Sequence, residues 1–218
     1  MVALFRVVGA MLILLRHGQT YSNVDRLLDT QLPGAELTDL GREQARAAGA
    51  AIMDRFDVDR VISSEALRAR QTAALGFGEH FDDIPAVAGL HEVNAGRWEM
   101  QNSRDAHSAY FTAFRGFYQR NLEAAIEGGD TLASFLERYH SALTTFVDRG
   151  GNTVVVSHGG AIRAYAANAT HERGVTAEYA ERSHLSNCTW VVLDPGDPAQ
   201  AFGAWDVVEW ADYPHPSS

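Results

Sequence analysis

The chain has 218 residues, and its contents of 46% hydrophobic and 21% charged residues are ordinary for a globular domain. Its formal net charge of −10 and the scattering of its 18 basic residues argue against nucleic acid or an anionic membrane as a partner. An anionic substrate would have to be bound by a local cluster of cations, and the single cysteine excludes an internal disulfide.

The first 15 residues are mostly apolar and faintly resemble a secretory leader. They lack a small-residue cleavage site, and the run is too short to span a membrane. Met11 begins a run that predicts the first strand. We therefore expect residues 1–10 to be an N-terminal extension of unassigned function, and residues 11–218 to form a single domain, because this length suits one sizeable core.

Short apolar runs alternate with stretches of helical periodicity along the rest of the chain. Strands are predicted at 12–15, 59–63, 84–90, 153–157, 189–193 and 202–209. Helices are predicted at 38–56, 65–75, 131–146 and 161–168, with Thr38 and Thr131 as N-caps. The first helix would bury one face, made of Leu40, Ala45, Ala48, Ile52 and Phe56. This order predicts an α/β fold in which helices flank both faces of a mostly parallel central sheet.

The segment 98–129 interrupts this order, because it is rich in aromatic residues but has no evident strand. Its aromatics are Trp98, Tyr110, Phe111, Phe114, Phe117 and Tyr118. Two compatible interpretations are a helical subdomain that packs its own aromatics and a lid that lines a substrate pocket. We predict a short, helical, lid-like insertion.

No metal site is predicted. Most of the nine histidines show none of the paired spacing that zinc sites require. The only cysteine, Cys188, lies in the apolar run 187–193, which predicts a buried, unreactive thiol. Such a thiol suits a reducing, cytoplasmic location.

Charged or titratable residues follow three of the predicted strands. His17 lies at the end of the first strand, Arg68 follows the second by a few residues, and His158 comes directly after the strand 153–157. In an open parallel sheet, ligands bind in the crevice at the carboxyl ends of the strands. We therefore expect these three residues to meet at one edge of the sheet.

Five ordered blocks carry a resemblance to a known family. Residues 16–23 (RHGQTYSN) match the pattern RHGxTxxN, residues 63–73 match SSxxxRAxQTA, and residues 90–99 resemble LxExxxGxWE. Residues 157–160 (SHGG) resemble a second-histidine motif, and residues 186–188 a late strand signature. Together these blocks resemble the histidine phosphatase superfamily, in its phosphoglycerate-mutase-like branch, over nearly the whole chain.

The resemblance implies a role for each matching residue. His17 would attack phosphorus and become a phosphohistidine, while Arg16, Arg68 and His158 would bind the phosphoryl oxygens. Glu92 would donate a proton to the leaving group and then activate water. Substrate contacts would come from Asn23, Gln19, Thr20, Gly159 and His91, of which His91 could instead simply pack. Arg70 and Arg163 are expected to be surface salt-bridge residues. The resemblance implies no metal and no cofactor.

The leading hypothesis is a metal-independent phosphatase that acts on a small phosphorylated metabolite. The alternative is a phosphoglycerate mutase, and a third hypothesis, from another class, is a non-catalytic module that binds a phosphorylated ligand. Met100 stands where the family commonly has glycine, so the pocket rim is expected to differ in shape. The lid is short, whereas glycolytic mutases of the family carry a longer insertion, which favours hydrolysis. The oligomeric state is left open, with a homodimer as one option.

Overall fold

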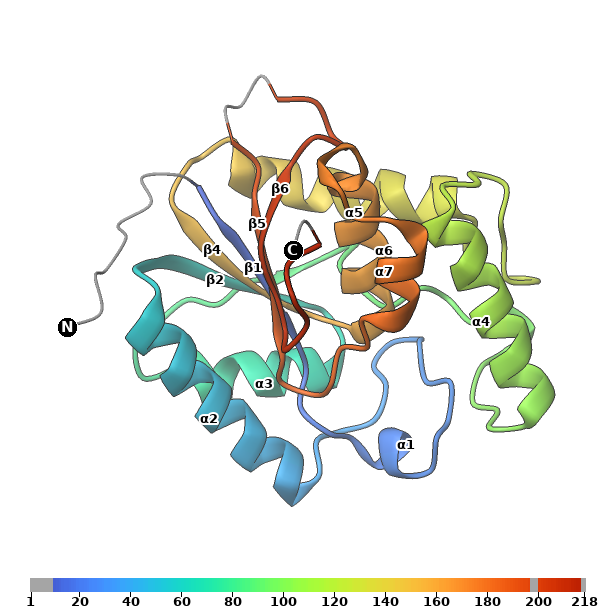
Figure 1. The fold of residues 1–218 in the computed structure, drawn as a ribbon. Helices are drawn as coiled ribbons and strands as arrows, with labels where there is room; N and C mark the ends of the chain where they lie inside the picture. The colour runs from blue at the N-terminus through green and yellow to red at the C-terminus, as the bar shows by residue number, and fades with distance from the viewer. Residues whose placement is uncertain (1–9, 197–199, 217–218) are drawn as a thin grey trace.

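The computed structural model describes residues 10–196 and 200–216, and the strands in this part of the chain form one sheet (Figure 1). Their order across the sheet is β3-β2-β4-β1-β5-β6. Their bounds are Leu12–Arg16 (β1), Val58–Ser64 (β2), Ala86–Val87 (β3), Asn152–Ser157 (β4), Trp190–Asp194 (β5) and Asp206–Trp210 (β6). The first four strands in this order are mutually parallel, and β5 is antiparallel to both of its neighbours. The predicted mostly parallel sheet is confirmed.

Helices cover both faces of the sheet, as predicted. One face carries α2 (Asp39–Arg55) and α3 (Leu67–Phe77), and the other carries α4 (Arg104–Tyr118), α5 (Leu132–Val147), α6 (Gly159–Ala169) and α7 (Ala177–Arg182) (Figure 1). Strand β1 shows why two cores form: Leu12 and Leu14 point to one core, while Ile13 and Leu15 point to the other. A strand buried on both faces has the continuous apolar run seen in the sequence.

The central strands end together at one edge. Arg16 pairs with Ser157, and Ser63 pairs with Val156, so the carboxyl ends of β1, β4 and β2 lie side by side. The expectation that these strand ends meet is therefore confirmed. Loops that leave this edge carry the chemistry described below.

Several predicted boundaries were wrong for local reasons. Helix α3 begins at Leu67, whose N–H donates to Pro33 O, and not at residue 65. Strand β6 begins at Asp206, because Phe202 packs against Tyr165 with ring centroids 5.3 Å apart and does not pair in the sheet. Leu40 was expected on the buried face of α2 but is exposed. Gly41 is buried in its place, where a Cβ would lie only 2.0 Å from Gln19 O.

Both interpretations of segment 98–129 describe part of it. Helix α4 is capped by Ser103 and buries Phe114 and Phe117 in the core. Phe111 lies in the same helix but is 65% exposed. Met100 has φ of +57°, a left-handed conformation that costs most residues about 1–2 kcal/mol and explains why glycine is common there. Met100 is exposed and does not line the pocket described below.

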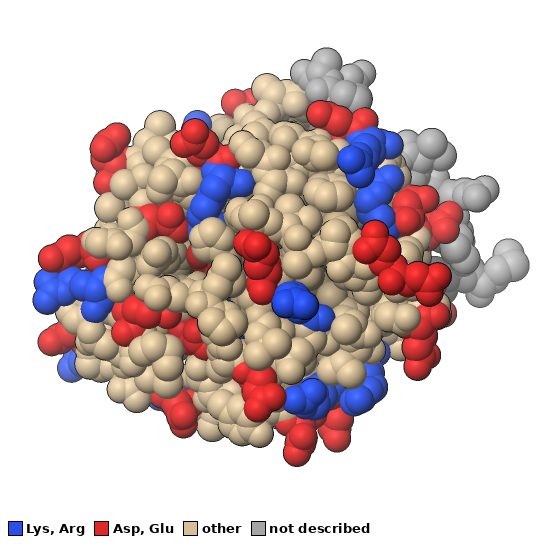
Figure 2. Space-filling model, turned by 180° about the vertical axis from the view of Figure 1, so that it is seen from behind, with Lys and Arg blue, Asp and Glu red and all other residues tan. Residues whose placement is uncertain are grey.

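The predicted extension 1–10 falls almost wholly outside the described residues. Within them, no helix combines the length and the apolar character needed to cross a membrane. On the face that Figure 2 shows, Arg side chains are interspersed with Asp and Glu and form no continuous basic patch.

Candidate active site

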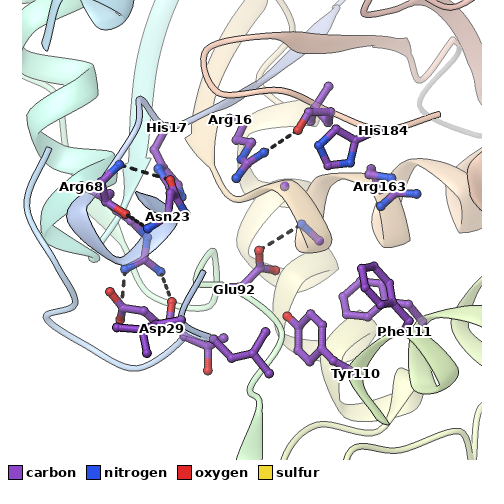
Figure 3. A pocket seen from close by; sticks show the side chains of 18 residues that line it. Arg16, His17, Asn23, Asp29, Arg68, Glu92, Tyr110, Phe111, Arg163 and His184 are labelled. Carbon is purple, nitrogen blue, oxygen red and sulfur yellow. Dashed lines mark hydrogen bonds and ion pairs between the residues drawn. The ribbon is translucent and has the colours of Figure 1, made fainter. Parts of the chain in front are cut away.

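A pocket of about 200 Å³ opens where β1, β2 and β4 end (Figure 3). Seven of the residues predicted from the sequence line it: Arg16, His17, Thr20, Asn23, Arg68, Glu92 and Gly159. Gln19, His91 and His158 do not line it. The pocket therefore brings together a histidine, two arginines and a carboxylate from segments far apart in the sequence.

His17 is held in one tautomer. Its backbone N–H donates to Ser157 O, which fixes the residue to the end of β4. Its ring Nδ1 lies 2.7 Å from Gly18 O, and a carbonyl can only accept, so Nδ1 carries the proton. In the neutral ring, Nε2 then has a free lone pair. This is the arrangement that a nucleophilic histidine needs.

The block 186–188 fixes the loop that carries His17. Asn187 Nδ2 donates to His17 O at 3.0 Å and to Asn23 Oδ1 at 3.1 Å. Asn23 Oδ1 also accepts from the N–H of Thr20, whose side chain caps the short helix α1 (Tyr21–Val24). With its oxygen occupied twice, Asn23 can offer only its amide NH₂ to a ligand in the pocket.

Arg68, which is buried, and Arg16, which is partly buried, lie side by side in the pocket wall. Arg16 donates from Nη1 to Leu185 O, and Arg68 donates from Nη2 to Asp29 O. Arg68 also lies 3.7 Å from the Asp29 carboxylate, with both side chains nearly inaccessible to solvent. Within the described part of the chain, Arg16 Nε and Arg68 Nη1 have no hydrogen-bond partner. Burial lowers the pKa of both guanidinium groups from the ordinary value.

His158 has different partners from the expected ones. It is fully buried, its Nδ1 accepts from Arg68 Nε at 3.2 Å, and its Nε2 donates to Ser64 Oγ at 2.9 Å. Both ring nitrogens are therefore used within the protein, and neither faces the pocket as a donor. In this structure His158 orients the guanidinium of Arg68.

The carboxylate of Glu92 lies against the first turn of α6. Its Oε1 accepts from the N–H groups of Val93 and Ala161, and its Oε2 accepts from the N–H of Gly160. The two helix N–H groups have no partner within the helix, so the carboxylate takes the place of a cap. Oε2 has only one donor and is the oxygen with a free position. Figure 3 shows Glu92 between the side of the pocket with His17 and the side with Tyr110.

Gln19 and His91, expected to bind substrate, serve other contacts. The Gln19 side chain accepts from Thr38 Oγ1 at the start of α2. His91 is half-buried, and burial followed by the charge of Arg138 lowers its pKa. Its position outside the pocket wall favours the packing interpretation that the sequence left open.

A search against known families matches residues 12–211 to the histidine phosphatase superfamily (branch 1). The chain belongs to this superfamily. The adenosylcobalamin/alpha-ribazole phosphatase of Escherichia coli K12 is 28% identical, with 83% of this chain and 88% of that protein covered. A 2,3-bisphosphoglycerate-dependent phosphoglycerate mutase of Methylocella silvestris is 30% identical, with 71% and 78% covered.

Solved structures of the superfamily share the fold. The mycobacterial glucosyl-3-phosphoglycerate phosphatase determined with VO₃ superposes with a TM-score of 0.74 at 25% identity, covering 93% of this chain and 98% of that one. A structure described as mycobacterial hydrolase 1 gives the same TM-score at 27% identity. The relatives thus include phosphatases and mutases, and the chain is a histidine phosphatase superfamily enzyme whose substrate these similarities do not specify.

The sequence missed several residues of the pocket wall. Asp29 lies in a segment without a chemical motif, and His184 precedes the last motif by two residues. Tyr110, by contrast, is one of the aromatics of segment 98–129 for which a pocket-lining role was considered, and it lines the pocket. Arg163 was expected on the surface but lines the pocket, while its Nη2 donates to Ala180 O. A signal for Arg163 existed, because it lies four residues after Gly159 and so on the same face of α6.

The buried histidines are held neutral. Burial, followed by the charge of Arg68, lowers the pKa of His17 and of His158 well below the ordinary value of 6.5. Neutral His17 keeps the lone pair that attack on phosphorus requires. Burial also raises the pKa of the Cys188 thiol to about 12, in line with the predicted buried, unreactive cysteine.

The lowered pKa values predict how stability depends on pH. Below about pH 6.5 the unfolded chain takes up protons on these histidines that the folded chain refuses, so the free energy of unfolding falls as pH falls. Each histidine contributes up to about 1.4 kcal/mol per pH unit. Urea unfolding between pH 7.5 and pH 5.5 should show this loss, and His158→Gln should reduce its slope.

The matched control is His80→Asn, which removes an exposed histidine. Burial also lowers the pKa of His91, His140 and His184, so these residues contribute to the wild-type slope in the same direction. The test is therefore the difference in slope between His158→Gln and the wild type. An identical slope in His158→Gln and wild type would contradict the prediction.

Proposed function

We propose that this enzyme is a phosphatase that hydrolyses a small phosphorylated metabolite through a phosphohistidine on His17. The observation that carries the proposal is the free Nε2 of His17, fixed by the Nδ1 bond to Gly18 O, in a pocket lined by Arg16 and Arg68. The pocket volume of about 200 Å³ suits a phosphoryl group and a compact organic body.

In the first step, a phosphomonoester places its phosphoryl group between Arg16 and Arg68. The guanidinium groups of both arginines and the amide of Asn23 would donate to its oxygens. His17 Nε2 attacks phosphorus, a P–N bond forms, and the P–O bond to the alcohol breaks. The two fixed cations stabilise the charge of the transferring group, which is why we propose that no metal ion is required. His158 contributes by orienting Arg68.

Glu92 supplies and recovers a proton. In its acid form it protonates the leaving alcohol oxygen, and the free position on Oε2 makes that atom the proton carrier. In the second step the Glu92 carboxylate accepts a proton from a water molecule that attacks the phosphohistidine. The P–N bond breaks, inorganic phosphate leaves, and neutral His17 is restored.

The runner-up is a phosphoglycerate mutase, in which the phosphohistidine returns its group to substrate. Overall length does not separate the two, because an alignment over 164 residues covers 78% of the Methylocella silvestris mutase, which gives that protein roughly 210 residues. Water access favours hydrolysis: Phe111, one of three aromatics of segment 98–129 at the pocket wall, is 65% exposed, so this side chain does not shield the pocket from water. A mutase has to keep water from its phosphoenzyme.

A single catalytic domain, a cytoplasmic location and a homodimer stay predictions from the sequence. The buried thiol of Cys188 supports the location. The non-catalytic alternative is disfavoured, because both His17 and Glu92 are present in the pocket.

The nucleophile is tested by His17→Ala, which should abolish turnover. Wild-type enzyme quenched during turnover should carry a phosphoryl label that is lost in acid and kept in base, as expected for a P–N bond. The sequence contains no lysine, so such a label cannot sit on a lysine amine. EDTA should leave activity intact. A label on serine or a carboxylate, or EDTA inhibition reversed by Mg²⁺, would refute the respective part.

The proton donor is tested by Glu92→Gln, which should slow hydrolysis of alkyl phosphates by roughly 10²–10⁴-fold. Nitrophenyl phosphate should lose much less, since nitrophenolate leaves without protonation. The measurement is kcat for both esters on the same preparation. Equal losses would show that Glu92 contributes to binding or structure only.

The distinction from a mutase is tested with 3-phosphoglycerate and a 2,3-bisphosphoglycerate primer. Release of inorganic phosphate from preferred phosphomonoesters should far exceed conversion to 2-phosphoglycerate, because water reaches the intermediate. A phosphate-release assay beside a coupled mutase assay measures both. Mutase turnover on the order of 10 s⁻¹ or above with negligible phosphate release would support the runner-up.

A further inference from the structure

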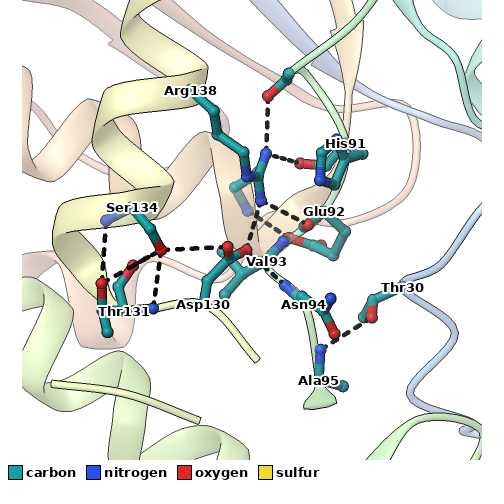
Figure 4. Close-up of polar contacts among 12 residues, drawn as sticks. Thr30, His91, Glu92, Val93, Asn94, Ala95, Asp130, Thr131, Ser134 and Arg138 are labelled. Carbon is teal, nitrogen blue, oxygen red and sulfur yellow. Dashed lines mark hydrogen bonds and ion pairs between the residues drawn. The ribbon is translucent and has the colours of Figure 1, made fainter. Parts of the chain in front are cut away.

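The segment 89–95, here called the acid loop, carries Glu92 and has little regular structure of its own. Arg138 of α5 binds three of its carbonyl groups (Figure 4). Nη1 donates to Gly89 O at 2.7 Å and to His91 O at 2.9 Å, and Nη2 donates to Glu92 O at 2.9 Å. One guanidinium therefore fixes the backbone on both sides of the Glu92 Cα.

An ion pair holds that guanidinium in place. Arg138 Nη2 lies 2.7 Å from Asp130 Oδ2, and the two side chains are only 18% and 15% exposed. Asp130 Oδ2 also accepts from the N–H of Asn94 at 2.9 Å, so it binds the acid loop directly. Phe135 packs against the guanidinium, 5.1 Å from its ring centroid. The ion pair is thus held in place by Phe135 of α5 and by the N–H of Asn94 in the acid loop.

Other elements bind the remaining part of the acid loop. Tyr110 of α4 donates to Val93 O at 3.1 Å, and Thr30 Oγ1 accepts from the N–H of Ala95 at 2.9 Å. Gly160 and Ala161 of α6 bind the Glu92 carboxylate itself. The side chain of Glu92 is thus anchored on α6, while its backbone is anchored mainly on α5 through Arg138.

We propose that Arg138, oriented by Asp130, is a positioning residue that sets the place of the Glu92 carboxylate relative to the leaving oxygen. This inference rests on the proposed role of Glu92 as proton donor. Arg138 does not line the pocket and touches no substrate. It acts because proton transfer needs hydrogen-bond distance, and a shift of about 1 Å can cost about 100-fold in rate. A lysine ammonium, which is compact and has no planar fork, cannot serve these separated acceptors together.

The test is Arg138→Lys, assayed with an alkyl phosphate and with nitrophenyl phosphate. Alkyl phosphate turnover should fall by about 10–100-fold, and nitrophenyl phosphate turnover by less than about 3-fold. In a Glu92→Gln background the same substitution should cause no further loss, because the residue acts only through Glu92. Asp130→Asn, which keeps the loop contacts of Arg138 but removes the charge pairing, should give a smaller change of the same kind.

Arg182→Lys is the matched control, because Arg182 forms an exposed ion pair with Glu178 on α7. It should leave the ratio of the two rates unchanged. Equal losses on both esters in Arg138→Lys and Asp130→Asn, or full additivity with Glu92→Gln, would overturn the positioning role. If Glu92→Gln alone shows no dependence on the leaving group, the proton-donor role has failed instead. The two failures are therefore distinguishable.

Discussion

The placement of two arginines, one buried and one partly buried, beside a buried histidine is the constraint on which the rest of the site depends. Removing a guanidinium from water costs several kcal/mol unless partners replace the water. Here the replacement is partial: Arg68 has Asp29 and His158, whereas Arg16 has the carbonyl of Leu185 and an unpartnered Nε among the described residues. The pocket therefore carries an excess of positive charge that a phosphoryl dianion would offset.

The same excess charge would prepare His17 for its proposed role as nucleophile. A protonated His17 would be a third cation next to Arg16 and Arg68, so burial and their charge keep it neutral. The hydrogen bond to Gly18 O then decides which nitrogen holds the lone pair. Anion binding and activation of the proposed nucleophile would thus follow from one arrangement, since the cations that would bind the phosphoryl group are among the causes that lower the pKa of His17.

Two glycines at the start of α6 allow the backbone of this helix to approach the side chains of the site closely. A Cβ on Gly159 would lie 3.0 Å from Arg16 Nε, and a Cβ on Gly160 would lie 2.8 Å from Glu92 Oε1 and 2.7 Å from a Phe114 ring carbon. Any larger residue at Gly160 would push away the Glu92 carboxylate or the Phe114 ring of α4. The pair of glycines thus allows one helix start to lie against an arginine, an acid and the lid together.

The sequence predicted the parts of this site that strands position. The apolar runs that end at His17 and His158 located the sheet edge, and the match to family blocks located Arg68 and Glu92. It could not give the partners of His158, because these depend on the direction of a side chain between two neighbouring strands. Gln19 was misplaced for the same reason, since nothing in its block distinguishes a residue facing α2 from one facing the pocket.

The outer half of the pocket is formed by a helix and loops and not by strand ends. This is why the sequence did not predict several of its residues. Its wall comes from α4, from the loop around Leu27 and Leu28, and from residues near His184, none of which belongs to a strand. Most side chains there can change without moving His17 or Arg16, because the sheet edge is fixed separately by β1, β2 and β4. Three pocket residues do connect this wall to the rest of the site: Asp29 pairs with Arg68, while Tyr110 and Thr30 bind the acid loop through Val93 O and the N–H of Ala95. A substrate body that shifts Tyr110 would shift the segment that carries Glu92, so contact with the alcohol portion would be linked to the placement of the proposed proton donor.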